Sequence, residues 1–198
     1  LALGAGAEQI PAAECSPFAV TTAATFREIR YEERGDVGYL QFDFYNGAMD
    51  TDQCRRLQET VAEAKKRPIK VLVLMGGADL WSNGIHLNVI EYAEDTAGES
   101  WQNILAIDDL IAEIIHSPNH YIVTALQGNA GAGGVPLALA GDKVLARRGI
   151  VLNPHTKNMG LYGSEYWTYL LPKRIGTDKA NQFTEQCLPW GTDVALEI

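Results

Sequence analysis

The chain of 198 residues is poor in cysteine and in positive charge, and each shortage excludes a class of protein. Its three cysteines, Cys15, Cys54 and Cys187, are odd in number and far apart, so the sequence indicates neither a disulfide framework nor a zinc site. With 16 Lys and Arg against 25 Asp and Glu, the net charge of −9 disfavours nucleic acid as a partner. We therefore expect no metal, no nucleic acid and no structural disulfide.

Long apolar runs are also missing. No segment approaches the length of a membrane span, and the first residues lack the order of a signal peptide, so we interpret the protein as cytoplasmic and unattached to a membrane. Residues 1–26 are rich in Ala, Gly and Pro and start without Met, which favours a linker from an upstream domain. Residues 27–198 then form the main domain, which we expect to be incomplete at its C-terminus because its last helix has barely begun.

Strand and helix patterns alternate along most of the chain, which predicts an α/β fold with a largely parallel sheet. Arg34-Gly35-Asp36 separates the two strands of a predicted hairpin, and Asp50 or Thr51 is suited to cap the first helix. A broad apolar stripe from Trp101 to Ile115 predicts a core helix. Strands are expected at 27–32, 37–44, 70–75, 121–126, 143–146 and 150–152, and helices after 50, at 87–93 and 101–115, from Ser164 or Glu165 to 171, at 177–187 and after 192.

A glycine-rich stretch, Gln127–Asp142, lies between a predicted strand and a predicted helix. Glycine allows positive φ and close approach of a ligand, and the first turn of a helix leaves N–H groups unpaired. Such a turn can hold a phosphate or the oxyanion of a polarised thioester carbonyl. Pro136 breaks the dinucleotide fingerprint, which disfavours phosphate. The residues alone leave open a purely structural role, in which glycine lets strand and helix pack closely.

A second glycine-containing stretch, Gly76–Leu87, also runs from a predicted strand into a predicted helix. The order of the Ser82-Asn83-Gly84 turn and the Gly133-Gly134 turn resembles the crotonase, or enoyl-CoA hydratase-like, superfamily. That resemblance implies the crotonase fold of repeated ββα units, here without its C-terminal helices. It also implies that the backbone N–H groups of Ile85 and Gly133 hold the thioester oxygen of an acyl-CoA, with coenzyme A contacts from Gly84, His86, Ala132 and Gly134.

The chain departs from the superfamily where hydratases carry their two catalytic glutamates. The position three residues beyond Gly133 is Pro136, and Pro154 is followed by His155. The resemblance therefore argues against hydration of an enoyl-CoA by the usual mechanism of the superfamily.

Longer runs resemble the C-terminal half of the HypX (HoxX) family of hydrogenase maturation proteins. The runs are Phe44–Met49, Ser82–Glu91, Gly128–Gly134 and Gly160–Pro172. In that family an upstream domain transfers a formyl group from formyl-tetrahydrofolate to CoA, and the crotonase-like half decarbonylates formyl-CoA to supply the CO ligand of [NiFe]-hydrogenase. The resemblance implies formyl-CoA as substrate and an upstream formyltransferase domain as partner.

Decarbonylation needs a base for the formyl proton, and Glu165 is the candidate because burial raises the basicity of a carboxylate. The alternative is an ordinary acidic residue in the first turn of a helix. The flanking Tyr162 and Tyr166 are candidate proton donors that also suit aromatic packing. His155 and His86 are further pocket candidates, although a lone histidine often has a structural role. The basic residues nearest to the site, as possible contacts of CoA phosphates, are Lys143, Arg147, Arg148 and Lys157.

Two classes of function remain open at this point. The first is a CoA-thioester enzyme, with decarbonylation of formyl-CoA ahead of another crotonase-type reaction such as hydration, hydrolysis or isomerisation. The second is a non-catalytic domain that binds CoA or supports assembly. A homo-oligomer is compatible with both.

Overall fold

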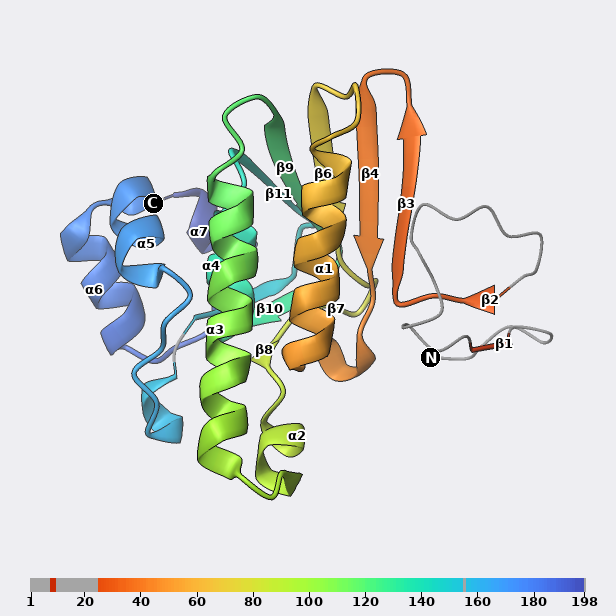
Figure 1. Ribbon diagram of the computed structural model, residues 1–198. Coiled ribbons are helices and arrows are strands. Elements are labelled where there is room, and N and C mark those ends of the chain that lie inside the picture. Colours follow the sequence, from red (N-terminus) through yellow and green to blue (C-terminus); the bar gives the residue numbers. More distant parts are fainter. Residues whose placement is uncertain (1–7, 10–24, 155, 198) are drawn as a thin grey trace.

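The protein is described by a computed structural model that covers residues 8–9, 25–154 and 156–197. A five-stranded sheet forms its centre, in the order β11-β9-β6-β4-β3. The edge strand β3 is antiparallel to β4, and all other neighbours are parallel. The bounds are β3 Ile29–Arg34, β4 Val37–Phe42, β6 Val71–Met75, β9 Tyr121–Leu126 and β11 Lys143–Ala146. This is the mixed α/β arrangement that the alternating pattern predicts (Figure 1).

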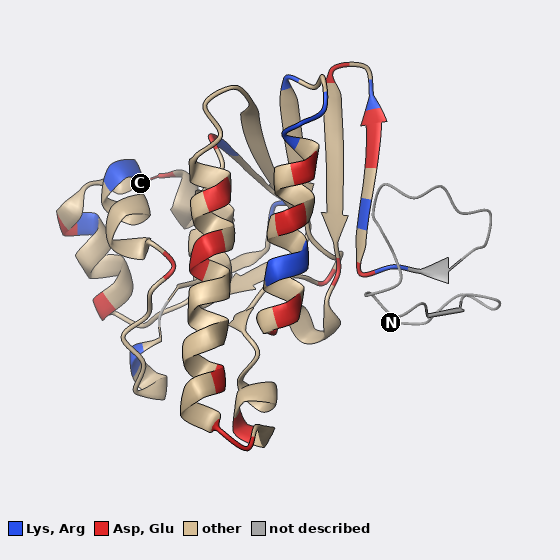
Figure 2. Cartoon of the chain, viewed as in Figure 1, with Lys and Arg blue, Asp and Glu red and all other residues tan. Residues whose placement is uncertain are grey.

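Two long helices lie side by side in front of this sheet, α1 (Thr51–Ala64) and α3 (Thr96–Ile115) (Figure 1). The first begins at a capping box. The Asp50 carboxylate accepts a bond from the Gln53 N–H at 2.8 Å, and the Gln53 side chain accepts one from the Asp50 N–H at 3.0 Å. Acidic residues line the outward faces of both helices, where charge stays hydrated (Figure 2).

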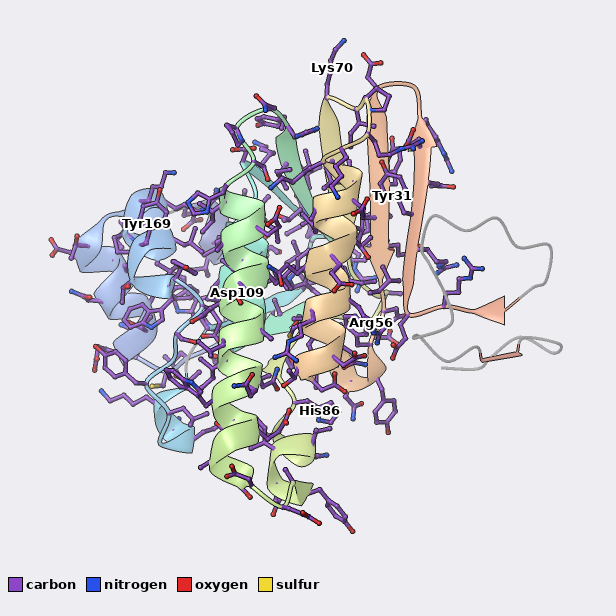
Figure 3. All side chains as sticks on the ribbon, in the orientation of Figure 1. Tyr31, Arg56, Lys70, His86, Asp109 and Tyr169 are labelled. Carbon is purple, nitrogen blue, oxygen red and sulfur yellow. The ribbon has the colours of Figure 1, made fainter. Side chains whose placement is uncertain are left out.

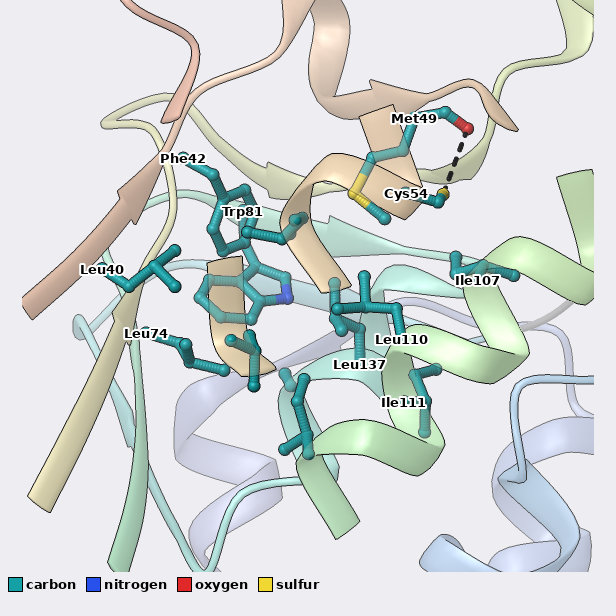
Figure 4. Packing of buried hydrophobic residues seen from close by; sticks show 14 of the residues in the cluster. Leu40, Phe42, Met49, Cys54, Leu74, Trp81, Ile107, Leu110, Ile111 and Leu137 are labelled. Carbon is teal, nitrogen blue, oxygen red and sulfur yellow. Dashed lines mark hydrogen bonds between the residues drawn. The ribbon is translucent and has the colours of Figure 1, made fainter. Parts of the chain in front are cut away.

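The main core fills the space between these helices and the sheet. Trp81 is 1% exposed and packs edge-to-face on Phe42, with ring centroids 4.9 Å apart (Figure 4). Buried residues of α3 meet this pair, among them Ile107, Leu110 and Ile111. The predicted core stripe of α3 is wrong at its start, because Trp101 and Leu105 are 59% and 38% exposed.

A second sheet of four strands runs β13-β12-β10-β7, and a short pair joins β5 to β8. The remaining helices include a pair at the left of the view and a short helix at its bottom (Figure 1). The strands are β5 Ala48–Met49, β7 Leu80–Ser82, β8 Gly84–Ile85, β10 Asn129–Gly131, β12 Val151–Asn153 and β13 Trp190–Gly191. The helices are η2 Tyr45–Gly47, α2 Leu87–Tyr92, α4 Gly134–Leu139, η3 Lys157–Met159, α5 Trp167–Ile175, α6 Thr177–Glu185 and α7 Thr192–Leu196.

One segment differs from expectation. The helix expected from Ser164 or Glu165 begins at Trp167, because Glu165 and Tyr166 have φ angles of +49° and +55°. Among residues 1–26, β1 (Glu8–Gln9) pairs in parallel with β2 (Thr25–Phe26). In the described part of the chain, no helix is long and apolar enough to cross a membrane.

Candidate functional site

The two glycine turns follow neighbouring strands of the four-stranded sheet and touch each other. β7 and β10 are parallel, with Ser82 opposite Ala130. A Cβ built on Gly84 would lie 2.9 Å from the Gly133 nitrogen. Since two bonds separate Gly84 Cα from the next nitrogen, the nitrogens of Ile85 and Gly133 lie within about 7 Å of each other. The backbones of the two turns are therefore in direct contact at Gly84 and Gly133.

The first turn is fixed by hydrogen bonds on both sides. The Gly84 N–H donates to Ser82 Oγ at 3.0 Å, inside the turn. The Asn83 backbone donates to the Gly47 carbonyl and its side-chain amide donates to the Asn46 carbonyl, each at 2.7 Å. The segment around η2 therefore holds the residues that precede Ile85.

The second turn is held equally firmly. The Ala132 N–H donates to the Asn153 carbonyl at 2.8 Å, and Trp81 Nε1 donates to the Gly134 carbonyl at 2.9 Å. The Gly133 N–H donates to no acceptor within the described residues. This backbone donor is thus positioned by its neighbours and remains available to a ligand.

A pocket of about 300 Å³ opens beside the second turn. The Glu165 side chain reaches into this corner, because a Cβ built on Gly133 would lie 2.5 Å from Glu165 Oε1. Glu165 is only 6% exposed. The lining is mainly apolar around this one buried carboxylate, and includes Ala132, Pro136, Pro154, Leu161, Tyr162 and Trp167.

The surroundings of Glu165 affect both the pKa of its carboxyl group and the conformation of its backbone. Burial raises the pKa of its carboxyl above the ordinary value, and the nearby Asp108 raises it further, although the Ser164 N–H donates to Oε2 at 2.8 Å. Its backbone and that of Tyr166 are left-handed, which costs about 1 kcal/mol or more per residue. The Glu165 N–H donates to Asp108 Oδ1 at 2.7 Å and helps to hold this conformation. The result is a buried, basic carboxylate kept in a strained segment.

Comparison with known proteins identifies the family. Residues 43–198 match the family model described as enoyl-CoA hydratase/isomerase. The chain belongs to this family. It is 52% identical over 193 residues to the hydrogenase maturation factor HoxX of Bradyrhizobium diazoefficiens. The aligned residues make up 97% of this chain and 34% of HoxX.

Solved structures agree. HypX of Aquifex aeolicus, in a crystal structure with tetrahydrofolic acid, is 55% identical in sequence and superposes with a TM-score of 0.89. The match covers 92% of this chain and 32% of the HypX chain. An enoyl-CoA hydratase of Bacillus halodurans has a TM-score of 0.78 at 20% identity over 86% of this chain and 70% of its own, which supports the fold. The chain spans about a third of the HoxX and HypX chains.

Among the other predicted site residues of this family member, the tyrosines are largely exposed. Tyr162 lines the pocket but is 85% exposed, and its ring lies 6.2 Å from that of Trp167. Tyr166 is 42% exposed and precedes α5. Both are close to Glu165 in the sequence, but of the two only Tyr162 belongs to the lining of the pocket.

Of the two candidate histidines, the structure describes only His86. His86 caps α2, with Nδ1 accepting from the Val89 N–H at 3.4 Å, and its backbone donates to Asn103 Oδ1 at 3.1 Å (Figure 3). This gives His86 a structural role at the end of the first turn. His155 lies outside the described residues.

One of the four basic candidates reaches the pocket. Lys157 lines it and pairs with Glu185 of α6. The other three, Lys143, Arg147 and Arg148, are exposed on β11 and the turn after it. The described residues contain no cluster of three or more His, Cys, Asp or Glu side chains that could hold a metal ion.

Sequence reasoning missed two polar residues of α3 that support the site. Asn103 is fully buried and donates to the Met49 carbonyl at 3.0 Å while accepting from the His86 N–H, so it ties β5 to the end of the first turn. Asp108 holds the backbone of Glu165. The available signal was a polar side chain among the apolar positions of a core helix, which requires a partner.

Proposed function

We propose that the chain binds the thioester end of an acyl-CoA and that its substrate is formyl-CoA, which it splits into CO and CoA during hydrogenase maturation. The single observation that carries this proposal is the Glu165 carboxylate, buried against the Gly133 turn in a mainly apolar pocket. The similarity to HoxX and HypX supports the choice of reaction. The reaction belongs in the cytoplasm, with formyl-CoA supplied by an upstream formyltransferase domain.

The chemistry requires only a base and a fixed carbonyl. In the proposed step, the N–H groups of Ile85 and Gly133 hold the formyl oxygen while Glu165 removes the formyl proton. The electron pair of the C–H bond stays on carbon as the C–S bond breaks, which releases CO and the CoA thiolate. Glu165 then returns the proton to sulfur. Formyl-CoA is thus converted to CO and CoA without an oxidant or a reductant.

The direct test is Glu165→Gln, which keeps the size and hydrogen-bonding capacity of the side chain and removes its basicity. CO release, trapped on reduced haemoglobin, should fall by about 10²–10⁴-fold, because general base catalysis is typically worth that much. CoA binding measured by calorimetry should stay nearly unchanged. Glu59→Gln, an exposed glutamate of α1, is the matched control and should leave both unchanged.

Other outcomes reassign the role. An unchanged rate in Glu165→Gln would move the proton transfer to another group, with His155 and Tyr162 as the next candidates. Equal losses of binding and rate would mark Glu165 as structural.

A non-catalytic CoA-binding domain is the second candidate function. The observation that favours it is Pro136, which stands where hydratases of the family carry a glutamate and lines the pocket. CoA binding without CO release by the wild-type protein would support this alternative over decarbonylation or another crotonase-type reaction.

A further inference from the structure

Asp108 reaches the candidate site from a distant part of the chain. It lies on α3, a helix whose buried face otherwise belongs to the core, and it is partly buried itself. Asp108 Oδ1 accepts a hydrogen bond of 2.7 Å from the backbone N–H of Glu165, 57 residues away. A charge-assisted bond of this kind is stronger than one between neutral groups. The carboxylate of one residue therefore anchors the main chain of the other.

The anchored segment needs such support. Glu165 and Tyr166 are consecutive left-handed residues and neither is glycine, a conformation that persists only where the surroundings impose it. The direction of the Glu165 side chain follows from this backbone, because Cβ is fixed by φ and ψ. The same side chain has its Oε1 against Gly133. Release of the anchor would free the segment to relax and would turn the carboxylate away from the second turn.

We propose that Asp108 is a positioning residue, which acts through the Glu165 backbone to hold the Glu165 carboxylate against the Gly133 turn. Its effect on catalysis rests on the proposed function of Glu165, but its effect on geometry does not.

Asp108 also affects the proton affinity of the site. Burial raises the pKa of both carboxyl groups, and the charge of Asp108 raises that of Glu165. The Ser164 hydroxyl lies close to both. The other titratable or charged groups that face this pair are Asp109 on α3, Cys54 on α1, and Tyr162, Lys157 and Glu185 around the pocket.

Two substitutions separate the effect of the hydrogen bond to the Glu165 backbone from the effect of the Asp108 charge. Asp108→Asn keeps an oxygen acceptor for the Glu165 N–H and removes the charge, whereas Asp108→Ala removes both. Glu59→Ala, at an exposed position of α1, is the control. The measurements are the pKa of Glu165 by NMR of carboxyl-labelled glutamate, with Glu165→Gln to assign the signal, and kcat and KM for CO release.

In Asp108→Asn, we expect the pKa of Glu165 to fall, kcat to stay within about tenfold of wild type, and the acidic limb of the pH–rate profile to move to lower pH. In Asp108→Ala, we expect kcat to fall about 100-fold with KM changed only a few-fold, because misplacement of a catalytic group by about 1 Å has an effect of that size. Glu59→Ala should match the wild type in both the pKa of Glu165 and kcat.

Three results would overturn the proposal. They are wild-type kcat and Glu165 pKa in Asp108→Ala, equal losses of kcat in the two Asp108 variants, or an unchanged Glu165 pKa in Asp108→Asn. If the wild-type protein releases no CO, the proposed function fails by itself. The NMR signal of Glu165 in the two variants then still decides whether Asp108 positions this carboxylate. Should Asp108→Ala not fold, Asp108→Asn and its pKa shift carry the test.

Discussion

At the scale of single residues, Glu165 combines features that stability alone would not select. Its carboxylate is removed from water beside a second carboxylate, and its backbone is left-handed. Such departures from favourable local chemistry gather at functional sites, where they are compensated by the rest of the fold. The burial of Glu165 should therefore reduce the stability of the protein whenever the carboxyl group is ionised.

The pH dependence of stability tests this cost. Because the pKa of Glu165 is raised in the folded state, its contribution to stability is fully present below the ordinary glutamate pKa and is lost as pH rises through the raised value. Glu165→Gln cannot ionise, so its melting temperature should exceed that of the wild type at pH 8 and approach it near pH 4. Each pKa unit corresponds to about 1.4 kcal/mol, or about 3–5 °C for a chain of this size. A difference that is independent of pH would contradict this reading.

At the scale of elements, the two turns can pack closely because glycines at their contacts carry no side chain. A Cβ built on Gly134 would lie 2.0 Å from the Ser82 carbonyl oxygen, and one on Gly128 would lie 2.3 Å from the backbone of Asp79 and Leu80. These glycines serve close packing, whereas Gly133 faces Glu165. Within the glycine-rich stretch, different residues thus fit the two predicted roles, close packing and contact with the candidate site.

Gly134→Ala should reverse the usual effect of such a change. Alanine is favoured over glycine within a helix by about 1 kcal/mol, but here the added methyl group meets backbone that cannot move cheaply. We expect a loss of about 2 kcal/mol or more in the free energy of unfolding, measured in urea. Gly191→Ala, which no atom within 4 Å opposes and which lacks positive φ, should stay within about 0.5 kcal/mol of wild type. A neutral Gly134→Ala would show that the turns can separate.

Sequence patterns predicted the order of these elements because periodicity reflects local physics. Asp50 caps α1 as expected, and Tyr121–Leu126 is the expected buried strand. The pattern failed where tertiary contacts decide. Trp101 has helical spacing but is 59% exposed. The left-handed turn at Glu165 depends on Asp108, which no local rule connects to it. Local propensity thus located the turns, but the supporting contacts of Glu165 required the structure.

At the scale of the whole molecule, the fold of the family is present without the two carboxylates that its hydratases use. One position is Pro136, which lines the pocket, and the other is His155. The candidate carboxylate instead approaches the second turn from the segment before α5. Because Glu165 replaces the two glutamates of the hydratases beside a similar backbone site, we expect the protein to catalyse a reaction other than hydration.

Crotonyl-CoA provides the corresponding test. We expect the protein to hydrate it no faster than solution does, because no carboxylate occupies Pro136 or residue 155 to activate water. Loss of the absorbance of the conjugated thioester is the measurement. Binding of CoA by the same sample, followed by calorimetry, excludes a trivial failure to fold. Rapid hydration would mean that Glu165 or another group has taken over that role.

The pairing of β7 with β10 has a consequence for how such proteins diversify. The two turns follow neighbouring parallel strands, which lie about 4.8 Å apart, so the sheet itself brings the turns together. That spacing is a property of every β-ladder and places no demand on side chains beyond the glycines that allow close approach. Evolution can therefore exchange the acids and bases around the site one at a time, because the contact between the two turns is inherited with the backbone.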